Sequence, residues 1–370
     1  MSSILHLIDT GGPGGAESVF LDLASGLRVG NLTSIAAVGR DGWLAGQVRA
    51  RGLTPLIFPA QGSVNLGYLK RIVRTLREHD VQLVIAHLFG AAIYASLAGR
   101  LTGVPVISVL HGQSDLADRE RFAAAKRFIV ARGSARVVFV SEGLRQDLQS
   151  RLKLAPDKTA VIENGIDMSR LLPADEGRLK QSLGLSPNAF LVGAVGNLRK
   201  PKGYDTFLRA AQRVRQRHPE ARFVIVGDTN GGLLPGLESL RAEFGLQDCV
   251  QFLGLRSDVP QILAGIDVFV SSSYTEGFSL ALVEAMASGK AAVATRSGGP
   301  ERILEHERTG LLVPPRDADA LAEAIGRMSD ASLRTTLGHA ARAAMTERYS
   351  SARMLRDYEA LASSLVRASR

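Results

Sequence analysis

Two glutamates, Glu276 and Glu284, stand in the segment EGFSLALVEAMASG with seven residues between them. Helical patterning begins near Ser279 and stops at Gly289, a residue type that commonly ends helices. We therefore expect Glu276 in the loop ahead of a helix and Glu284 about one turn inside it. Because side chains lean toward the N-terminus of their helix, Glu284 can reach back toward a ligand bound there.

The start of this helix has the properties of an anion site. The backbone N–H groups near Phe278, Ser279 and Leu280 would be free to donate to phosphate oxygens. A carboxylate beside a phosphate needs another partner, and sugar or ribose hydroxyls would supply it. The pattern indicates a site for a phosphorylated sugar; the alternative is an ordinary helix with a charged residue at each end.

A cationic loop, GNLRKPKG, follows the first apolar run of the second half of the chain. It presents Arg199, Lys200 and Lys202 between two glycines. Cations at the end of a strand could neutralise a diphosphate, each contact contributing about 1.5–3 kcal/mol when partly buried. The alternative is a charged loop that is simply solvated.

A glycine-rich segment, GGPGGAE, comes directly after the first apolar run and leads into a helix at about Ala16. Glycines such as Gly14 and Gly15 let the backbone approach a phosphate closely, and the helix N-terminus favours an anion. The dinucleotide fingerprint would require glycine where Glu17 stands, which disfavours a nicotinamide enzyme. The alternative is a tight strand-to-helix turn.

A histidine, His111, ends the fifth apolar run within VLHG. At the carboxyl end of a parallel strand it would face the ligand-binding edge of the sheet, where it could position or protonate a substrate. The alternative is a polar residue whose partners lie within the fold.

These segments need a scaffold, and short β-branched runs alternating with longer amphipathic stretches predict one. The runs expected as strands are ILHLID, SIAAVG, PLIFPA, QLVIAHL, VPVISVLHG, ARVVFVS and TAVIENG in the first half, and FLVGAVGNL, ARFVIVGD, VQFLG, IDVFVSSS, AAVATRS and GLLVPP in the second. Continuous Val, Ile and Leu runs are typical of parallel strands buried on both faces. We expect an α/β protein with two Rossmann-like doubly wound domains facing each other across a cleft. The expected ranges are an acceptor-side domain at 1–172, a nucleotide-sugar domain at 173–349 and a helix at 350–370.

The composition excludes several classes of protein. The 370 residues exceed one ordinary core, and a hydrophobic share of 45% indicates a folded chain. The net charge is +9, yet aromatics are only 5% and there is no arginine-rich tract, so nucleic acid is disfavoured. A single cysteine, no signal-peptide pattern and no apolar run of membrane-spanning length favour the cytoplasm.

Taken together, the four segments resemble family 4 of the retaining glycosyltransferases, which have the two-domain GT-B fold. The resemblance extends over nearly the whole chain. Its C-terminal signature is carried by Glu276, Glu284, EAMASG, the pair Gly298 and Gly299, and Glu301 with TGLLVPP; GGPGGAE is similar to the N-terminal loop. The last helix, YSSARMLRDYEAL, is similar to the segment that crosses back to the N-terminal domain in that family.

The resemblance implies a role for each matched residue. Glu284 would hold ribose hydroxyls, Glu276 would contact the donor sugar, and Lys202 would neutralise the diphosphate. Gly14 and Gly15 would border the phosphates, and His111 would lie near the transferred sugar. It also implies retention of anomeric configuration without a bound metal or cofactor, in the synthesis of cell-surface polysaccharide or glycolipid from a nucleotide-diphosphate sugar and a sugar or lipid-linked acceptor.

Three positions depart from the family pattern. Asn197 stands where the family usually has an arginine, so one diphosphate cation is missing, and Arg199 is a candidate to replace it. Ser272 and Ser273 replace a Pro-Ser pair, and Ala291 replaces a proline; both changes concern structure more than chemistry. Donor-binding candidates are therefore Gly14, Gly15, Asn197, Arg199, Phe278, Ser279, Leu280 and Glu284, and catalytic candidates are His111, Lys202 and Glu276.

Two other functions remain open at this point. A glycoside hydrolase would use a carboxylate pair, and Glu276 with Glu284 could be one. A binding protein that kept the fold but lost activity would also fit, since Asn197 removes an expected cation.

A basic amphipathic stretch, DRERFAAAKRFIVAR, could contact an anionic membrane surface or a lipid-linked acceptor at the inner membrane face. Its basic residues are Arg119, Arg121, Lys126, Arg127 and Arg132. The simpler reading is a helix that covers the sheet and shows its charges to water.

Overall fold

The computed structural model describes residues 2–59, 65–112, 122–171, 176–230 and 232–368. The chain forms two compact units, unit 1 from Met1–Gly165 with Ser351–Arg370 and unit 2 from Ile166–Ser350. The first boundary falls after Gly165, whereas the sequence indicated a boundary after residue 172. Ile166 N donates to Tyr349 O at 2.9 Å, so the residues that follow Gly165 are hydrogen-bonded within unit 2.

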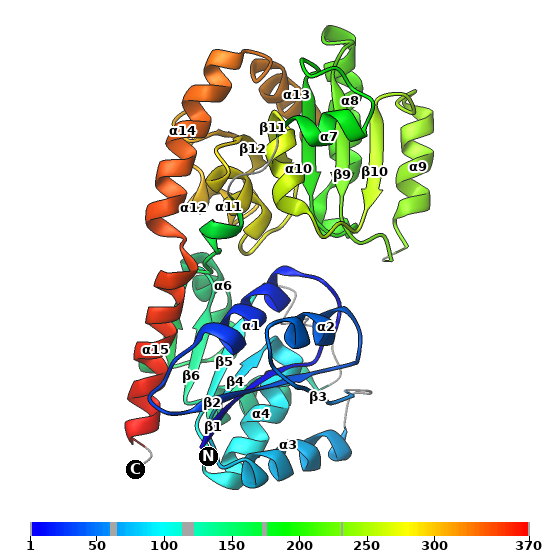
Figure 1. Ribbon diagram of the computed structural model, residues 1–370. Coiled ribbons are helices and arrows are strands. Elements are labelled where there is room, and N and C mark those ends of the chain that lie inside the picture. Colours follow the sequence, from blue (N-terminus) through cyan, green and yellow to red (C-terminus); the bar gives the residue numbers. More distant parts are fainter. Residues whose placement is uncertain (1, 60–64, 113–121, 172–175, 231, 369–370) are drawn as a thin grey trace. The chain divides into compact units, whose positions relative to one another are not determined.

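Unit 1 contains a parallel sheet in the order β3-β2-β1-β4-β5-β6-β7, so every apolar run expected in this half forms a strand (Figure 1). The strands are β1 Ser3–Ile8, β2 Thr33–Val38, β3 Pro55–Ile57, β4 Val81–His87, β5 Val106–Leu110, β6 Arg136–Phe139 and β7 Thr159–Val161.

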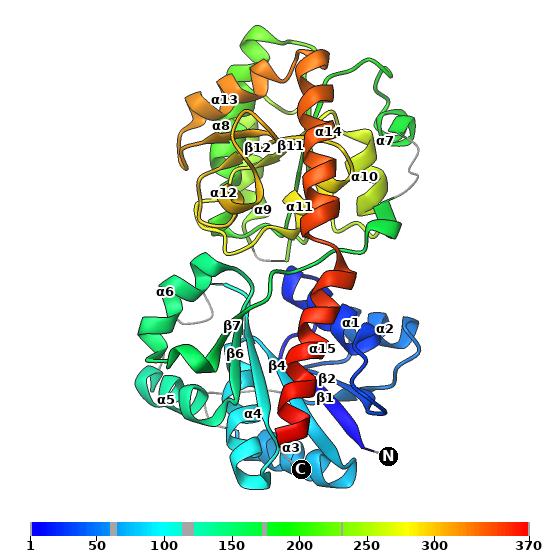
Figure 2. The ribbon, with the colours of Figure 1, turned by 90° about the vertical axis from the view of Figure 1, so that its left-hand side faces the viewer.

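Helices cover both faces of this sheet. Helices α1, α2 and α15 lie on one face, and α3, α4 and α5 pack together on the other (Figures 1 and 2). Their bounds are α1 Gly15–Gly26, α2 Trp43–Ala50, α3 Leu66–Glu78, α4 Phe89–Thr102, α5 Ala123–Gly133, α6 Glu142–Leu152 and α15 Ser351–Ala368, with the 3-10 turn η2 at Pro156–Lys158.

Helix α15 carries the last segment of the chain back to unit 1. Met354 and Tyr358 on this helix are fully buried, and Glu359 accepts a hydrogen bond from the backbone N–H of Arg28 at 3.0 Å. Gly26 at the end of α1 permits the approach, because a Cβ there would lie 2.8 Å from a methyl carbon of Leu355. Helix α15 is therefore part of the core of unit 1.

Unit 2 has a second parallel sheet, in the order β10-β9-β8-β11-β12-β13. Again each apolar run expected from the sequence forms a strand. The strands are β8 Leu191–Val195, β9 Arg222–Val226, β10 Val250–Gly254, β11 Val268–Ser271, β12 Ala291–Thr295 and β13 Leu311–Val313.

The helices of unit 2 also form two layers. Helix α8 contacts α9 and α13 on one face of the sheet, and α11 contacts α10 and α14 on the other face (Figure 1). Their bounds are α7 Glu176–Ser182, α8 Tyr204–Arg217, α9 Leu234–Glu243, α10 Val259–Gly265, α11 Leu280–Ala287, α12 Pro300–Ile303, α13 Ala318–Arg327 and α14 Ala331–Arg348, with 3-10 turns η3 Met168–Leu171 and η4 Lys200–Lys202.

In both units the first three strands follow one another toward one side of the sheet, and the next strand returns to the middle and pairs with the first. Strands β1 and β4 are neighbours in unit 1, and β8 and β11 are neighbours in unit 2. Loops that leave such a pair diverge to opposite faces, which opens a crevice at the carboxyl ends of the strands. The glycine-rich segment follows β1, the cationic loop follows β8 and the Glu276 loop follows β11, so these motifs lie where ligands bind in such sheets.

Candidate functional site

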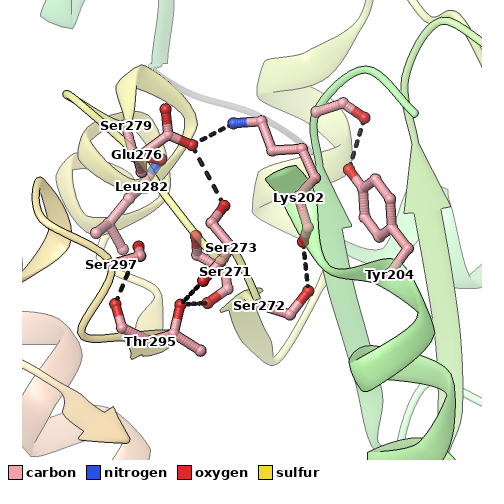
Figure 3. Close-up of polar contacts among 11 residues, drawn as sticks. Lys202, Tyr204, Ser271, Ser272, Ser273, Glu276, Ser279, Leu282, Thr295 and Ser297 are labelled. Carbon is pink, nitrogen blue, oxygen red and sulfur yellow. Dashed lines mark hydrogen bonds and ion pairs between the residues drawn. The ribbon is translucent and has the colours of Figure 1, made fainter. Parts of the chain in front are cut away.

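An ion pair joins the two loops that leave the middle of the unit 2 sheet. Lys202 lies in η4, after β8, and Glu276 lies in the loop after β11. Lys202 Nζ contacts Glu276 Oε2, with 28% of the lysine side chain and 15% of the glutamate side chain exposed (Figure 3). The structure thus brings together two residues that are 74 positions apart in the chain.

The backbone around Glu276 is held at both ends. Glu276 N donates to Ser297 O at 2.8 Å, and Gly299 N donates to Glu276 O at 2.7 Å. Gly298 has φ +112, and a Cβ at Gly299 would lie 2.8 Å from the carbonyl oxygen of Gly277, so this pair of positions requires glycine. The Gly-Gly pair therefore fixes the loop that presents Glu276.

Two serines in the same loop complete the support (Figure 3). Ser273 Oγ donates to the Glu276 carboxylate at 3.3 Å, and Ser272 Oγ donates to Lys202 O at 2.9 Å. Both serines are buried. The position that departs from the family pattern, Ser272, thus ties the Glu276 loop to the Lys202 turn.

Tyr204 is buried beneath the cationic loop and is hydrogen-bonded to its first residue. Its hydroxyl donates to Gly196 O at 2.6 Å, and burial, followed by the nearby charge of Glu276, raises the pKa of Tyr204 far above its ordinary value. The neutral phenol is therefore a permanent donor. Gly203, at φ +63, lies against the carbonyl of Ser272, which leaves no space for a side chain where η4 turns into α8.

Helix α11 begins and ends where the sequence predicts. Ser279 caps the N-terminus, with its side chain accepting from Leu282 N, and Gly289 follows the C-terminus at φ +76. Within the described ranges no hydrogen bond is made by the N–H groups of Phe278 or Leu280, which precede and begin the helix. Glu284 is partly exposed on α11.

Asn197 and Arg199 lie in the cationic loop but have surroundings different from those of Lys202. The side-chain oxygen of Asn197 accepts from Asp228 N at 3.2 Å and so joins the loops that follow β8 and β9. Arg199 is exposed and lines a pocket whose walls include neither Lys202 nor Glu276. Lys202 is therefore the cation that the structure brings to Glu276.

In unit 1 the glycine-rich segment follows β1, and α1 begins at Gly15 with Gly14 as its N-cap. The Glu17 carboxylate lies directly against Gly14, where a Cβ would collide with it, and Thr10 Oγ1 donates to Glu17 at 2.7 Å. A carboxylate thus accompanies the helix N-terminus, where the glycine-rich sequence by itself had indicated an anion site.

A second carboxylate near this segment, Asp9, was not singled out from the sequence. Desolvation by burial, with a smaller contribution from the charge of Glu17, raises the pKa of Asp9 to about 6. Its carboxylate lies against the backbone of Gly90 in the first turn of α4, where any Cβ would collide with it. A carboxylate directly after a buried strand was the available signal.

His111 follows β5, as predicted, and pairs with a second histidine that sequence reasoning missed. His87, the last residue of β4, has its Nδ1 3.1 Å from His111 Nε2, and the rings stack with centroids 5.3 Å apart. Burial lowers the pKa of His111 to about 3, and burial together with the charges of His111 and His6 lowers that of His87. Both rings are neutral near pH 7, one donating a hydrogen bond to the other.

Three further features of the structure concern metal ligands, membrane-spanning helices and the basic stretch. No group of three His, Cys, Asp or Glu residues that could hold a metal occurs in the described ranges, and none of their helices is long and apolar enough to span a bilayer. Of the basic stretch, Arg119 and Arg121 lie outside the described residues, whereas Lys126, Arg127 and Arg132 lie on α5.

Comparison with known proteins matches both halves of the chain to one family. The model described as Glycosyltransferase Family 4 matches residues 13–170, and that described as Glycosyl transferases group 1 matches residues 189–331. The Escherichia coli UDP-Gal:alpha-D-GlcNAc-diphosphoundecaprenol alpha-1,3-galactosyltransferase is 30% identical over 269 residues, which cover 70% of this chain and 69% of that protein. A D-inositol 3-phosphate glycosyltransferase of Salinispora arenicola is 29% identical over 316 residues, covering 79% and 70%.

The solved structures of Anabaena HepE agree with this result. HepE in complex with UDP and glucose superimposes with a TM-score of 0.86 at 26% identity, covering 98% of this chain and 99% of HepE. HepE in complex with UDP-glucose gives the same TM-score at 25% identity with the same coverage. The chain therefore belongs to the family 4 glycosyltransferases and has their GT-B fold.

Proposed function

We propose that this glycosyltransferase transfers a sugar from a uridine diphosphate sugar to a sugar or lipid-linked acceptor, retaining the anomeric configuration and using no bound metal. The uridine donor is supported by the UDP and UDP-glucose complexes of HepE. The acceptor class is supported by the name of the Escherichia coli relative, which acts on a diphosphoundecaprenol-linked sugar. The biological setting would be the synthesis of a cell-surface polysaccharide or glycolipid.

The observation that carries this proposal is the Lys202–Glu276 pair at the N-terminal side of α11. Lys202 carries three N–H donors, so it can contact a phosphate oxygen while it remains paired with Glu276. Lys202 and the N–H groups that begin α11 would then stabilise the charge that develops on the leaving diphosphate. Glu276 would accept hydrogen bonds from donor-sugar hydroxyls, and Glu284 from ribose hydroxyls.

The residues of unit 1 keep the roles that the family resemblance implies, Gly14 and Gly15 beside the phosphates and His111 beside the transferred sugar. The lowered pKa of His111 supports a hydrogen-bonding role, since a ring that is neutral at pH 7 is a poor proton donor to a leaving group. We accordingly assign His111 to positioning the sugar.

A ligand screen tests the donor assignment. We expect UDP to raise the melting temperature of the protein more than ADP, GDP or inorganic diphosphate does, since a ligand that binds only the folded state stabilises it. If no nucleotide diphosphate raises the melting temperature, the proposal is contradicted. If GDP or ADP raises it more than UDP does, the donor carries guanine or adenine instead of uracil.

A product assay tests the chemistry. UDP-sugars that bind are incubated with lipid-linked and free sugar acceptors, with and without EDTA, and the linkage is read by NMR. We expect a glycoside of unchanged anomeric configuration and equal rates with and without EDTA. Inversion, or loss of activity that a divalent metal restores, would refute the corresponding part. Hydrolysis of nitrophenyl glycosides without nucleotide would favour the carboxylate-pair hydrolase instead.

Arg199 as a replacement for the cation missing at Asn197 stays a separate proposal. It requires a strong defect of Arg199→Ala in UDP binding by calorimetry. A neutral result would assign diphosphate neutralisation to Lys202 and the α11 N–H groups alone.

We further propose that α5 of unit 1 makes peripheral contact with an anionic membrane. Phe122 and Phe128 are 54% and 63% exposed, and Arg132 lies over the Phe128 ring at 5.6 Å. Helix α5 itself has little amphipathic character, contrary to the expectation from the sequence, so the proposal depends on these exposed rings and the cation beside one of them. We expect sedimentation with phosphatidylserine vesicles at low salt, reduced by Phe128→Ser; failure to sediment would refute the contact.

A further inference from the structure

The pocket that Arg199 lines lies in unit 2, between α8 and α9, and has a volume of about 570 Å³. We call it the α8–α9 pocket. Its lining includes three groups, namely the cations Arg199, Lys200 and Arg316, the leucines Leu233, Leu237 and Leu240, and Asp205 with Tyr274. Of the proposed donor residues, Arg199 is part of this lining, whereas Lys202, Glu276 and Glu284 are not. The loops after β8 and β11 therefore present one set of side chains to the donor site and another to this pocket.

The pocket has an excess of positive charge. Within the described ranges, none of Arg199, Lys200 and Arg316 has a carboxylate oxygen within 4.0 Å. The carboxylate in the lining, Asp205, accepts a hydrogen bond from the Tyr274 hydroxyl at 2.6 Å and so is already engaged. Cations that converge on a concave surface without carboxylate partners concentrate anions there.

One cation of the pocket wall, Arg316, is held in place by its surroundings. The guanidinium of Arg316 lies 3.8 Å from the centroid of the Tyr274 ring, and the same tyrosine hydroxyl also contacts Thr206 Oγ1 at 3.0 Å. The Tyr274 hydroxyl is thus fixed by Asp205 and Thr206, and the ring it holds in place lies against Arg316. Because the arginine covers one face of the ring, Tyr274 is less suited to stacking against a sugar.

The opposite wall is apolar. Leu237 is buried, and Leu233 and Leu240 are partly buried and pack against the hydrophobic core of unit 2. Gly236, on the same helix, leaves open space, because a Cβ at this position would meet no atom within 4 Å. A ligand that fills the pocket would therefore place an anionic group against the cations and an apolar group against the leucines.

We propose that the α8–α9 pocket binds an amphipathic phosphate, that is, a phosphate or diphosphate ester of an apolar alcohol, at a site distinct from that of the nucleotide sugar. Pockets of a few hundred Å³ with an apolar wall and a few convergent polar groups are typical ligand sites. This inference goes beyond the proposed function and requires none of the donor-site roles. In the sequence, Pro201 and Thr275 of the lining are next to Lys202 and Glu276. A ligand in the α8–α9 pocket would therefore contact the same loops that present the donor-site residues.

The test uses the full chain and three probes in calorimetric titrations: geranyl diphosphate, inorganic diphosphate and geraniol. Each is titrated with and without saturating UDP. We expect geranyl diphosphate to bind in the presence of UDP at least tenfold more tightly than either fragment. Absence of binding when UDP is present would overturn the proposal, and so would equal affinity for inorganic diphosphate, which would mean that only an anion is recognised.

Two variants locate the ligand. Gly236→Phe fills the open space beside α9 and should abolish binding of geranyl diphosphate, while Gly46→Phe, at an exposed helical glycine of unit 1 that also lacks neighbours within 4 Å, should not. Arg316→Gln should weaken binding about tenfold, whereas Arg217→Gln, at an exposed position on α8, should not.

Melting temperature and UDP affinity, measured for every variant, separate the possible failures. Unchanged geranyl diphosphate affinity in Gly236→Phe and Arg316→Gln would overturn the pocket assignment even if UDP binds normally. Loss of UDP binding by the unmodified chain would contradict the donor proposal and leave the comparison of these variants with their controls intact.

Discussion

The middle strands of the two sheets have the same topology, but the groups at and near their carboxyl ends differ in electrostatic character. We call these two regions the unit 1 edge and the unit 2 edge. In unit 1, His6, His87 and His111 have lowered pKa values and Asp9 has a raised one, with burial as the largest cause in each case. Every one of these shifts favours the neutral form. In unit 2, Lys202 and Glu276 form an ion pair that remains partly exposed. One edge suppresses charge, and the other presents it.

The difference follows from what lies around each edge. The rings of His6 and His87 both contact Phe20 edge-on, at centroid distances of 6.5 and 5.6 Å, so these two imidazoles pack against an apolar ring. The unit 2 pair lies in loops held by backbone and serine hydrogen bonds, with part of each side chain in solvent. An edge of the second kind suits a diphosphate, and one of the first kind suits uncharged hydroxyl groups.

The largest expected effect tests the charged edge. Lys202→Ala should lower kcat by about a hundredfold or more, because one preorganised cation at a leaving diphosphate is removed, while KM for the UDP-sugar changes less. Steady-state kinetics with circular dichroism as the folding control would measure this. Unchanged turnover by a folded variant would remove Lys202 from the chemistry.

The next largest effect tests the neutral edge. The raised pKa of Asp9 means that the folded protein binds the proton more tightly than the unfolded chain does. The stability linked to this group is complete below about pH 4 and is lost as the pH rises through about 6. Asp9→Asn should therefore stabilise the protein at pH 8 by at most about 3 kcal/mol, with the gain disappearing near pH 4.

Chemical denaturation of both proteins at pH 8 and pH 4 would measure this difference. A gain of equal size at both pH values, or destabilisation at pH 8, would show that the folded protein does not raise the pKa of Asp9.

A smaller effect returns to the charged edge. Glu284→Ala should weaken UDP binding by roughly tenfold, the loss of one charge-assisted hydrogen bond to ribose, with kcat at saturating donor less affected. Calorimetric titration with UDP would detect it. If the dissociation constant stays the same, Glu284 does not contact the nucleotide.

The last effect, a change of slope with pH, concerns the buried histidines. The lowered pKa of His6 means that only the unfolded chain binds a proton between about pH 6.5 and 3, so the linked stability is lost as the pH falls through this range. His6→Gln should make the fall in unfolding free energy shallower by up to about 1.4 kcal/mol per pH unit. The exposed His79 provides the matched control, His79→Gln. Parallel pH profiles for wild type and His6→Gln would contradict the buried, neutral assignment.

Sequence reasoning predicted the elements of the fold and the segments of the site. Every apolar run expected as a strand is a strand, and α11 lies between Ser279 and Gly289 as expected. These features depend on hydrophobic period, caps and glycines, which act over a few residues and can be read locally. The structure divides the chain after Gly165 instead of after residue 172, and the Ile166 N to Tyr349 O hydrogen bond on the unit 2 side joins residues that no local pattern connects.

The sequence by itself therefore determined which residues lie at the carboxyl edges of two parallel sheets and which family they match. Only the tertiary structure decided that Lys202 pairs with Glu276, that His87 supports His111, and that Asn197 binds the backbone of Asp228. It also decided that Arg199 and Arg316 line one pocket. Such pairings join residues far apart in the chain, and their geometry depends on strand order and loop path, which no local pattern specifies.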